Sequence, residues 1–164
     1  MSKTLYIARH GKSSWDFEDI ADIDRPLSTR GVNNSYLMAE RLKTKGMIPG
    51  LLISSPASRA LHTAVIYIRT FGLTWDSLKI NEKFYFGYSN DILQVIEHVD
   101  DHFSSLMVIG HNPAFTELAN SLSLNPVEDI PTAGIVTLIF PTDQWALVRK
   151  VKTEKVNLDY PKKQ

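Results

Sequence analysis

The stretch Leu5-Tyr6-Ile7-Ala8-Arg9-His10-Gly11 decides the fold of this chain, because four apolar residues lead directly into a polar turn that ends in glycine. A short apolar run bounded by a turn signal predicts a strand that is buried on both faces. The same layout occurs twice more: Leu51-Leu52-Ile53 leads into Ser54-Ser55-Pro56, and Leu106-Met107-Val108-Ile109 leads into Gly110-His111-Asn112. We therefore predict three buried strands, each followed at once by polar residues.

Helix-like segments separate these strands. Their apolar residues recur every three or four positions, which places them on one face of a helix. Four helices are expected: one that Ser28 caps and Gly46 ends, with Val32, Tyr36, Ala39 and Leu42 facing inward, and three that begin at Ser55-Pro56, Asn90 and Asn112-Pro113. Further short strands are expected at Leu78–Ile80, Ile135–Phe140 and Trp145–Val151. Strands that alternate with helices predict βαβ units, so the fold class is α/β: three layers, with a mostly parallel sheet and helices on both faces.

The composition limits the class of protein. The 164 residues are 43% hydrophobic and 22% charged, which suits one globular domain. We place this domain at residues 1–151 and expect residues 152–164 to form a polar tail that frays. Acidic and basic residues number 18 each, which argues against a nucleic-acid-binding or membrane-surface protein. No cysteine is present, which excludes disulfides and thiolate catalysis. The sequence has neither a signal-peptide layout nor an apolar run long enough to cross a bilayer, so a cytoplasmic location is expected.

Residues suited to phosphate chemistry follow the three buried strands. Arg9 and His10 follow the first strand, Arg59 lies shortly after the second, and His111 follows the third. The carboxyl ends of parallel strands share one edge of a sheet, and ligands bind at that edge. Guanidinium groups grip phosphoryl oxygens in a bidentate manner, and a neutral imidazole is a competent nucleophile near pH 7. We therefore predict a phosphoryl-transfer site with His10 as the nucleophile, because His10 lies in the tightest turn.

Three motifs carry a resemblance to a known family. Arg9-His10-Gly11, Ser55-Pro56-Ala57-Ser58-Arg59-Ala60 and Gly110-His111-Asn112-Pro113 resemble, in this order, the signatures of the histidine phosphatase (phosphoglycerate-mutase-like) superfamily. The segments 9–15 and 24–31 further resemble the short branch that contains the SixA-type phosphohistidine phosphatases. A lone Arg-His-Gly is a weak signal, whereas three motifs in order at predicted strand ends are a strong one.

The resemblance covers most of the chain and implies a phosphoglycerate-mutase-like fold and a set of roles. His10 would carry the phosphoryl group in a pocket formed by Arg9, Arg59 and His111. Glu82 falls about where the family has the acid that protonates the leaving group. The substrate contacts expected in the same turns are Gly11, Lys12 and Asn112. Neither a metal ion nor an organic cofactor is expected, because the arginines supply the positive charge.

Three functions remain open. The first is a phosphatase that acts through phospho-His10, either on phosphohistidine in a protein or on a small phosphate ester. The second is a mutase, which must enclose its intermediate, although the short gaps between the motifs leave little sequence for a lid. The third is a phosphoprotein-binding module without turnover, which the presence of all four core residues disfavours. The expected partner is a phosphorylated protein or a small phosphate ester, and neither a nucleic acid nor a membrane.

Two other groups of charged residues have simpler interpretations. His98 and His102 are spaced to share a metal ion on a helix face, but the aspartates between them favour a solvated face, so no metal site is expected. Acidic residues also gather in the segment after the first motif. This group either serves solubility alone or forms an acidic rim that disfavours polyanionic substrates; its members are Asp16, Glu18, Asp19, Asp22 and Asp24.

Overall fold

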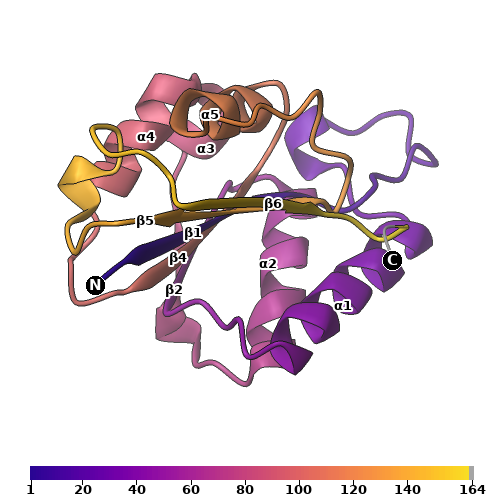
Figure 1. Ribbon diagram of the computed structural model, residues 1–164. Coiled ribbons are helices and arrows are strands. Elements are labelled where there is room, and N and C mark those ends of the chain that lie inside the picture. Colours follow the sequence, from indigo (N-terminus) through magenta and orange to yellow (C-terminus); the bar gives the residue numbers. More distant parts are fainter. Residues whose placement is uncertain (163–164) are drawn as a thin grey trace.

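The sheet is the frame that positions the site. In the computed structural model, which describes residues 1–162, six strands pair in the order β3-β2-β4-β1-β5-β6 (Figure 1). The strands are β1 (Lys3–Arg9), β2 (Leu51–Ser54), β3 (Leu78–Ile80), β4 (Ser105–Gly110), β5 (Ile135–Phe140) and β6 (Lys155–Asp159). Pairing is parallel from β3 through β1, and β5 is antiparallel to both of its neighbours. The prediction of a mostly parallel sheet is confirmed.

Helices cover both faces of this sheet. One face carries α1 (Thr29–Thr44) and α2 (Ser58–Phe71), and the other carries α3 (Lys83–Phe86), α4 (Ser89–Glu97) and α5 (Ala114–Leu122), as Figure 1 shows. Three short 3-10 helices lie in the connections: η1 (Asp22–Asp24), η2 (Trp75–Ser77) and η3 (Trp145–Leu147). The three-layer α/β class is thus as predicted. No helix within residues 1–162 combines the length and the apolar character that a membrane span needs, and the cytoplasmic location stays a prediction.

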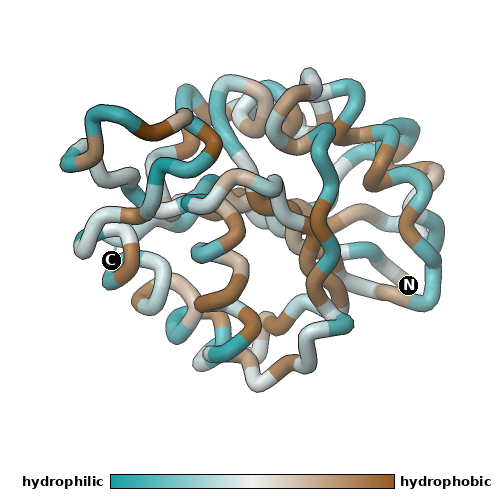
Figure 2. Tube along the Cα trace, turned by 180° about the vertical axis from the view of Figure 1, so that it is seen from behind, coloured by the Kyte–Doolittle hydropathy of each residue, from teal (hydrophilic) through white to brown (hydrophobic). Residues whose placement is uncertain are grey.

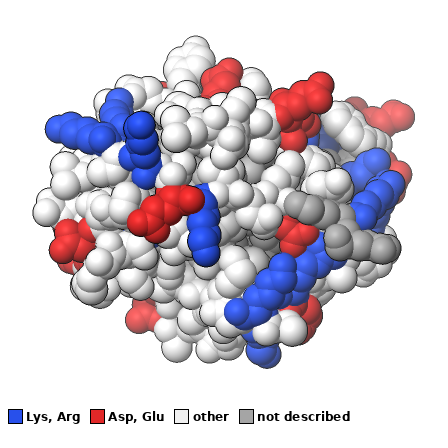
Figure 3. Space-filling view, in the orientation of Figure 1, with Lys and Arg blue, Asp and Glu red and all other residues white. Residues whose placement is uncertain are grey.

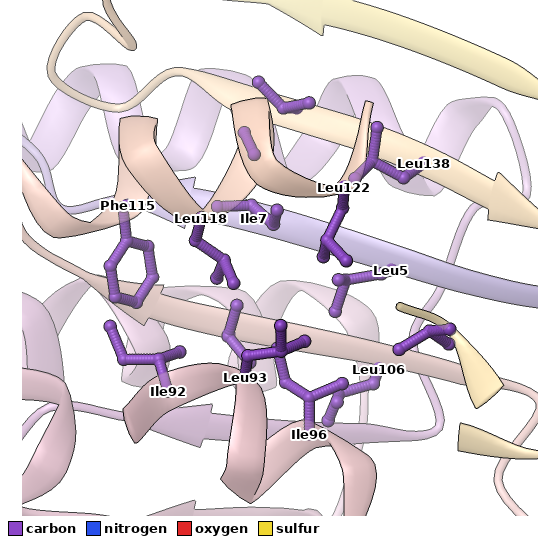
Figure 4. Close-up of a cluster of buried hydrophobic side chains, with 14 of the residues drawn as sticks. Leu5, Ile7, Ile92, Leu93, Ile96, Leu106, Phe115, Leu118, Leu122 and Leu138 are labelled. Carbon is purple, nitrogen blue, oxygen red and sulfur yellow. The ribbon is translucent and has the colours of Figure 1, made fainter. Parts of the chain in front are cut away.

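The alternation of side chains along the strands builds two cores. Leu5 and Ile7 of β1 contact the core beneath α4 and α5, whereas Tyr6 and Ala8 contact the core beneath α1 and α2. Figure 4 shows Leu118 of α5 beside Ile7, and Ile96 of α4 beside Leu106 of β4. In Figure 2 the hydrophobic stretches lie along the central strands, and the outer loops are mostly hydrophilic. Burying one such side chain is worth about 1.5–3 kcal/mol, so the two cores fix the strands and the turns at their ends.

The strand register places the three polar turns next to one another. Arg9 pairs with Gly110 across β1 and β4, and Ser54 pairs with Ile109 across β2 and β4. The three buried strands therefore end at one edge of the sheet. The turns that follow these strands lie next to one another at this edge, as the sequence predicted.

The segment Trp145–Val151 differs from the prediction, because it does not form a strand. It begins with η3, in which Trp145 is fully buried and donates its indole Nε1–H to Phe103 O at 2.9 Å. Val148, three residues further on, is buried in the same core. A spacing of three residues suits a helical turn and not the alternation of a strand, so the strand prediction here was wrong.

The prediction of a fraying tail was wrong for residues 155–159, which form an edge strand, whereas its last two residues, 163 and 164, lie outside the described part of the chain. β6 pairs with β5 and places Val156 and Leu158 against the core, with polar residues between them. Arg41 of α1 donates to Asp159 Oδ1 at 2.6 Å and holds the strand from the side. An edge strand needs only a few apolar residues on its inner face, which is why this one looked like a polar tail. The domain therefore extends beyond the expected boundary at residue 151.

Helix starts follow the predictions in part. Ser28 caps α1 as expected, and its hydroxyl accepts the N–H of Gly31 at 3.0 Å. Tyr36, expected to face inward, is exposed, because the buried face of α1 runs through Ser35, Met38 and Leu42 and Tyr36 lies to the side of it. The helix expected at Ser55-Pro56 begins three residues later, at the start of α2.

Candidate active site

The turn after β1 holds His10 at the edge of the sheet. His10 N–H donates to Gly110 O at 3.1 Å, and Gly11 N–H donates to the buried hydroxyl of Thr63 at 3.1 Å. The turn is therefore tied to β4 on one side and to α2 on the other. α1 approaches so closely that a Cβ on Gly11 would lie 2.6 Å from Gly31 O. Packing thus requires glycine after the histidine, and it leaves the histidine on a rigid backbone.

The ring of His10 is buried and is held in one tautomer. The residue is 6% exposed, and its Nδ1 lies 2.6 Å from Gly11 O. A carbonyl oxygen can only accept, so Nδ1 carries the proton and Nε2 keeps its lone pair. Burial lowers the pKa of His10 to about 4, and the charges of Arg59 and Arg9 act in the same direction against the raising effect of the Gly11 carbonyl. The ring is therefore neutral at pH 7, which is the state that a nucleophile needs.

Arg59 lies in the first turn of α2 and points at the same nitrogen. Its Nε–H donates to His10 Nε2 at 3.4 Å. Its other two nitrogens contact η1: Nη1 donates to Asp22 O at 2.7 Å, and Nη2 donates to Asp22 Oδ2 at 3.0 Å. The side chain is almost fully buried. The guanidinium group is thus held beside the His10 lone pair by a residue of a different segment.

His111 follows β4 and packs against His10, with the ring centroids 4.9 Å apart. Burial, followed by the charges of His10 and Arg59, lowers the pKa of His111 to about 3, so this ring is neutral as well. His111 Nε2 lies 2.8 Å from Ser55 Oγ, and this oxygen accepts the N–H of Ala57 at 3.2 Å. The Ser55 hydroxyl proton has no other acceptor within residues 1–162, so it is directed at Nε2, and Nδ1 of His111 carries the proton. Ser55, expected to open α2, instead sets the tautomer of His111.

Two buried nitrogen atoms of the site have no hydrogen-bond partner within residues 1–162: Nε of Arg9 and Nδ1 of His111. A buried donor without an acceptor costs about 1–3 kcal/mol, and such groups are uncommon in native structures. Both belong to side chains that the sequence placed around a phosphoryl group. This unused donor capacity supports an anionic ligand at this edge of the sheet.

The loop before β5 is fastened to the site by Arg9 and Asn112. Arg9 Nη1 donates to Ile130 O at 2.9 Å and lies 3.8 Å from Asp129 Oδ2. The side-chain NH2 of Asn112 donates to Asp129 Oδ1 and Ile130 O, and its oxygen accepts from the N–H and the hydroxyl of Thr116. These four bonds use the whole capacity of the Asn112 amide. The Asn112 amide therefore fastens the loop before β5, and its role as a substrate contact stays a prediction.

Asp22 and Tyr85 complete the mouth of the site, and the sequence analysis did not assign them to it. The Tyr85 hydroxyl donates to Asp22 Oδ2 at 2.7 Å, and the Tyr85 ring lies edge-on to His111 with the centroids 5.3 Å apart. The Tyr85 hydroxyl and the Arg59 guanidinium hold the pKa of the Asp22 carboxyl below its ordinary value, so this acid is ionised at neutral pH. No motif marks either residue. The only sequence feature that hinted at Asp22 was its place in the acidic group of the loop after the first motif.

Glu82 and Lys12 are not brought into this cluster. Both are exposed, and within residues 1–162 neither side chain makes a hydrogen bond or an ion pair. From the segment that contains Glu82, it is Tyr85 that reaches the site. Within residues 1–162, no group of three or more His, Cys, Asp or Glu side chains could hold a metal ion.

The pH dependence of turnover should report the state of His10. A nucleophile with a pKa of about 4 stays neutral down to mildly acidic pH, whereas an ordinary imidazole is half protonated near pH 6.5. We expect kcat/KM to be flat from pH 7 to about pH 5 and to fall about tenfold per pH unit below about pH 4. Thermal unfolding at each pH is the control: the unfolded chain takes up protons near pH 6.5 that the two buried histidines do not, so acid also lowers stability. An acid limb centred near pH 6.5 in folded protein would contradict this assignment.

Comparison with known proteins agrees with this arrangement. A family model described as the histidine phosphatase superfamily (branch 1) matches residues 5–84. An uncharacterised chloroplastic protein of Arabidopsis thaliana is 31% identical over 132 residues, and the match covers 75% of this chain but only 60% of that protein. The structure of the protein histidine phosphatase SixA in complex with tungstate superposes with a TM-score of 0.81 at 22% identity, covering 96% of this chain and 97% of that one. A protein assigned as SixA of Nakamurella multipartitia gives a TM-score of 0.80 at 20% identity, covering 96% of both chains.

The similar proteins agree with the fold and with the place of the site in this structure. At 20–22% identity the solved structures show the fold, which is the phosphoglycerate-mutase-like arrangement expected from the sequence. The matched residues 5–84 include both the turn of His10 and the first turn of α2, whose side chains meet in the site. Residues 5–84 match the histidine phosphatase superfamily, and the fold of the chain is that of the SixA-type structures.

Proposed function

We propose that the protein is a metal-independent phosphatase that works through a phosphohistidine intermediate on His10 and acts on phosphoramidates, with phosphohistidine in a partner protein as the substrate class. One observation carries the proposal: Nε2 of the neutral, buried His10 lies 3.4 Å from Nε of Arg59, which donates its hydrogen to it. The match of residues 5–84 to the superfamily supports phosphatase chemistry. The structurally similar SixA binds tungstate, which is a tetrahedral oxyanion like phosphate.

The reaction has two steps. His10 Nε2 attacks the phosphorus atom, a P–N bond forms, and the bond from phosphorus to the leaving group breaks. Water then attacks the same phosphorus atom, the P–N bond to His10 breaks, and phosphate leaves. Arg9, Arg59 and the Nδ1–H of His111 are the donors that stabilise the negative charge on the transferring oxygens. They supply the positive charge that a metal ion supplies in other phosphatases.

The choice of phosphoramidates rests on the acids near His10. An alkoxide leaving group needs a proton, and the best donor is a carboxylic acid that stays protonated near neutral pH. Asp22, which contacts Arg59, is held ionised by its neighbours, and Glu82 is exposed without a contact to the site. The second ring nitrogen of phosphohistidine takes a proton from solvent near neutral pH, so the P–N bond breaks to release a neutral imidazole without such an acid. The local electrostatics thus favour phosphohistidine over alkyl phosphate esters.

Variants of the two acids test this preference. We expect Asp22→Ala to lower kcat/KM about tenfold on phosphoramidate and on esters alike, because a hydrogen bond that positions Arg59 is lost. We expect Glu82→Gln to affect an alkyl phosphate and phosphoramidate to the same small extent. Steady-state rates on both substrates and on an aryl phosphate give the comparison. A Glu82→Gln loss confined to the alkyl ester would identify Glu82 as the proton donor and reopen the small-ester function.

A trapping experiment tests the proposal as a whole. The protein is mixed with labelled phosphoramidate in the presence of EDTA and quenched in alkali, which preserves phosphohistidine. We expect one label per active chain at His10, found by peptide mapping, and a burst of product that matches the label. Turnover that stops in EDTA and returns with a divalent ion would contradict the metal-free scheme.

A further inference from the structure

Exposed aromatic side chains border the mouth of the site. Trp15 is 73% exposed and Phe86 is 69% exposed. The Trp15 ring lies 4.0 Å from the guanidinium of Arg25, and the Phe86 ring packs edge-on to Tyr85 with the centroids 4.7 Å apart. Phe17 is also half exposed, and Arg25 donates to its carbonyl at 3.5 Å. We call Trp15, Phe17, Tyr85 and Phe86 the aromatic rim.

The aromatic rim is connected to the catalytic cluster by direct contacts. Arg25 lies 4.0 Å from Asp22, and Tyr85 donates to the same carboxylate. Asp22 in turn holds Arg59, and the Tyr85 ring touches His111. The aromatic rim therefore borders the site on the side of Asp22 and Tyr85, where the surface around a phosphorylated side chain at His10 can lie against it.

Positive and negative charges are separated around the mouth. Arg9 and Arg59 place positive charge at the centre. Acidic residues flank this centre on two sides: Asp129 lies beside Arg9 on one side, and the loop between β1 and α1 carries a run of acids on the other, with Arg25 packed on Trp15 as the cation among them. Figure 3 shows acidic side chains projecting at the upper right, where Figure 1 places this loop. The exposed acids of the loop are Asp16, Glu18 and Asp19.

We propose that the aromatic rim and the acids around it form a docking surface for a protein whose phosphorylated side chain is flanked by lysine or arginine. This inference rests on the proposed function and names the surroundings of its substrate. A phosphate flanked by positive charge is complementary to a positive pocket flanked by negative charge. Exposed tryptophan and phenylalanine rings add cation–π and apolar contacts to the same lysine and arginine side chains. A small polyanion such as a bisphosphate meets repulsion from the same acids.

Matched peptides provide the test. Two phosphohistidine peptides differ only in flanking residues, which are lysines in one and glutamates in the other, and phosphoramidate is the small reference substrate. We expect kcat/KM for the lysine peptide to exceed that for the glutamate peptide by about tenfold or more at low salt, and the difference to shrink as salt is added. Dissociation constants of stable phosphonate analogues of both peptides should show the same order without requiring turnover.

Variants locate the surface. We expect Trp15→Ala and Phe86→Ala to lower the ratio of kcat/KM for the lysine peptide to that for phosphoramidate by about tenfold. Trp75→Ala is the control, because Trp75 is also exposed but lies beyond the end of α2 that is remote from Arg59. Glu18→Lys should reduce or reverse the preference between the peptides, whereas Glu40→Lys, late in α1, should not. Melting temperatures confirm that each variant is folded.

The outcomes separate the two claims. Equal rates and equal affinities for the two peptides, or equal effects of Trp15→Ala and Trp75→Ala, would overturn the docking surface while leaving phosphatase activity intact. Failure to hydrolyse phosphoramidate, with no label on His10, would overturn the proposed function. In that case the affinities of the phosphonate peptides still decide whether the docking surface exists.

Discussion

Replacement of His10 by alanine is expected to abolish turnover, with kcat on phosphoramidate falling on the order of 10⁴-fold or more, because no other group can accept the phosphoryl group in the covalent step. The imidazole is neutral, and its Nε2 is unprotonated and accepts a long hydrogen bond from Arg59 Nε. The variant should also fail to incorporate label from phosphoramidate after an alkaline quench.

The fold should survive this change. His10 packs at the edge of the sheet, and the backbone bond from His10 N–H to Gly110 O does not depend on the side chain. Thermal unfolding checks this point. His62→Ala is the matched control, because His62 lies in α2 three residues after Arg59 and is exposed, and its removal should leave turnover near that of the parent protein. Label that persists in His10→Ala at the parent level would refute the assignment of the nucleophile.

Replacement of Arg59 by alanine is expected to cost about 3–4 kcal/mol of transition-state stabilisation, which is about 10²–10³ in kcat/KM, because a preorganised charge at the transferring group is lost. Arg59→Lys should recover only a small part, since a lysine ammonium cannot reproduce the planar fork. The loss should appear in kcat as well as in KM. Rates on phosphoramidate and on an aryl phosphate provide the measurement.

A second arginine in the same helix provides the control for Arg59. Arg69 lies in the last turn of α2 and is exposed, so Arg69→Ala should leave the rate within about twofold, as is usual for surface substitutions. Arg59→Ala also breaks the ion pair with Asp22, so melting temperatures must accompany the kinetics. Full activity in Arg59→Lys would show that Arg59 does not grip the transferring group.

The outline of the site could be predicted because its polar residues directly follow the buried strands in the sequence. Leu5–Ala8, Leu51–Ile53 and Leu106–Ile109 are short apolar runs that end at turn residues, which favours buried strands, and parallel pairing then brings their ends to one edge. Arg9, His10 and His111 directly follow these strands, so their convergence needed no tertiary information beyond the sheet order.

The end of the chain could not be predicted in this way. Trp145 and Val148 read equally well as strand or helix in a short apolar run, and only the core that buries Trp145 decides between them. β6 was missed because two apolar residues among polar ones carry little signal until β5 offers its free edge.

The sequence by itself determined the fold class, the resemblance to the family and the meeting of His10, Arg59 and His111 at one edge of the sheet, because burial of apolar strands and the chemistry of single side chains are local properties. The tertiary structure decided the rest. Asp22 and Tyr85 lie in the site and Glu82 does not, and the Asn112 amide binds the loop before β5. Each of these placements depends on contacts between segments far apart in the chain. The neutral state of the two histidines is likewise a property of the folded protein, since burial lowers their pKa values and burial exists only once the sheet and helices have packed together.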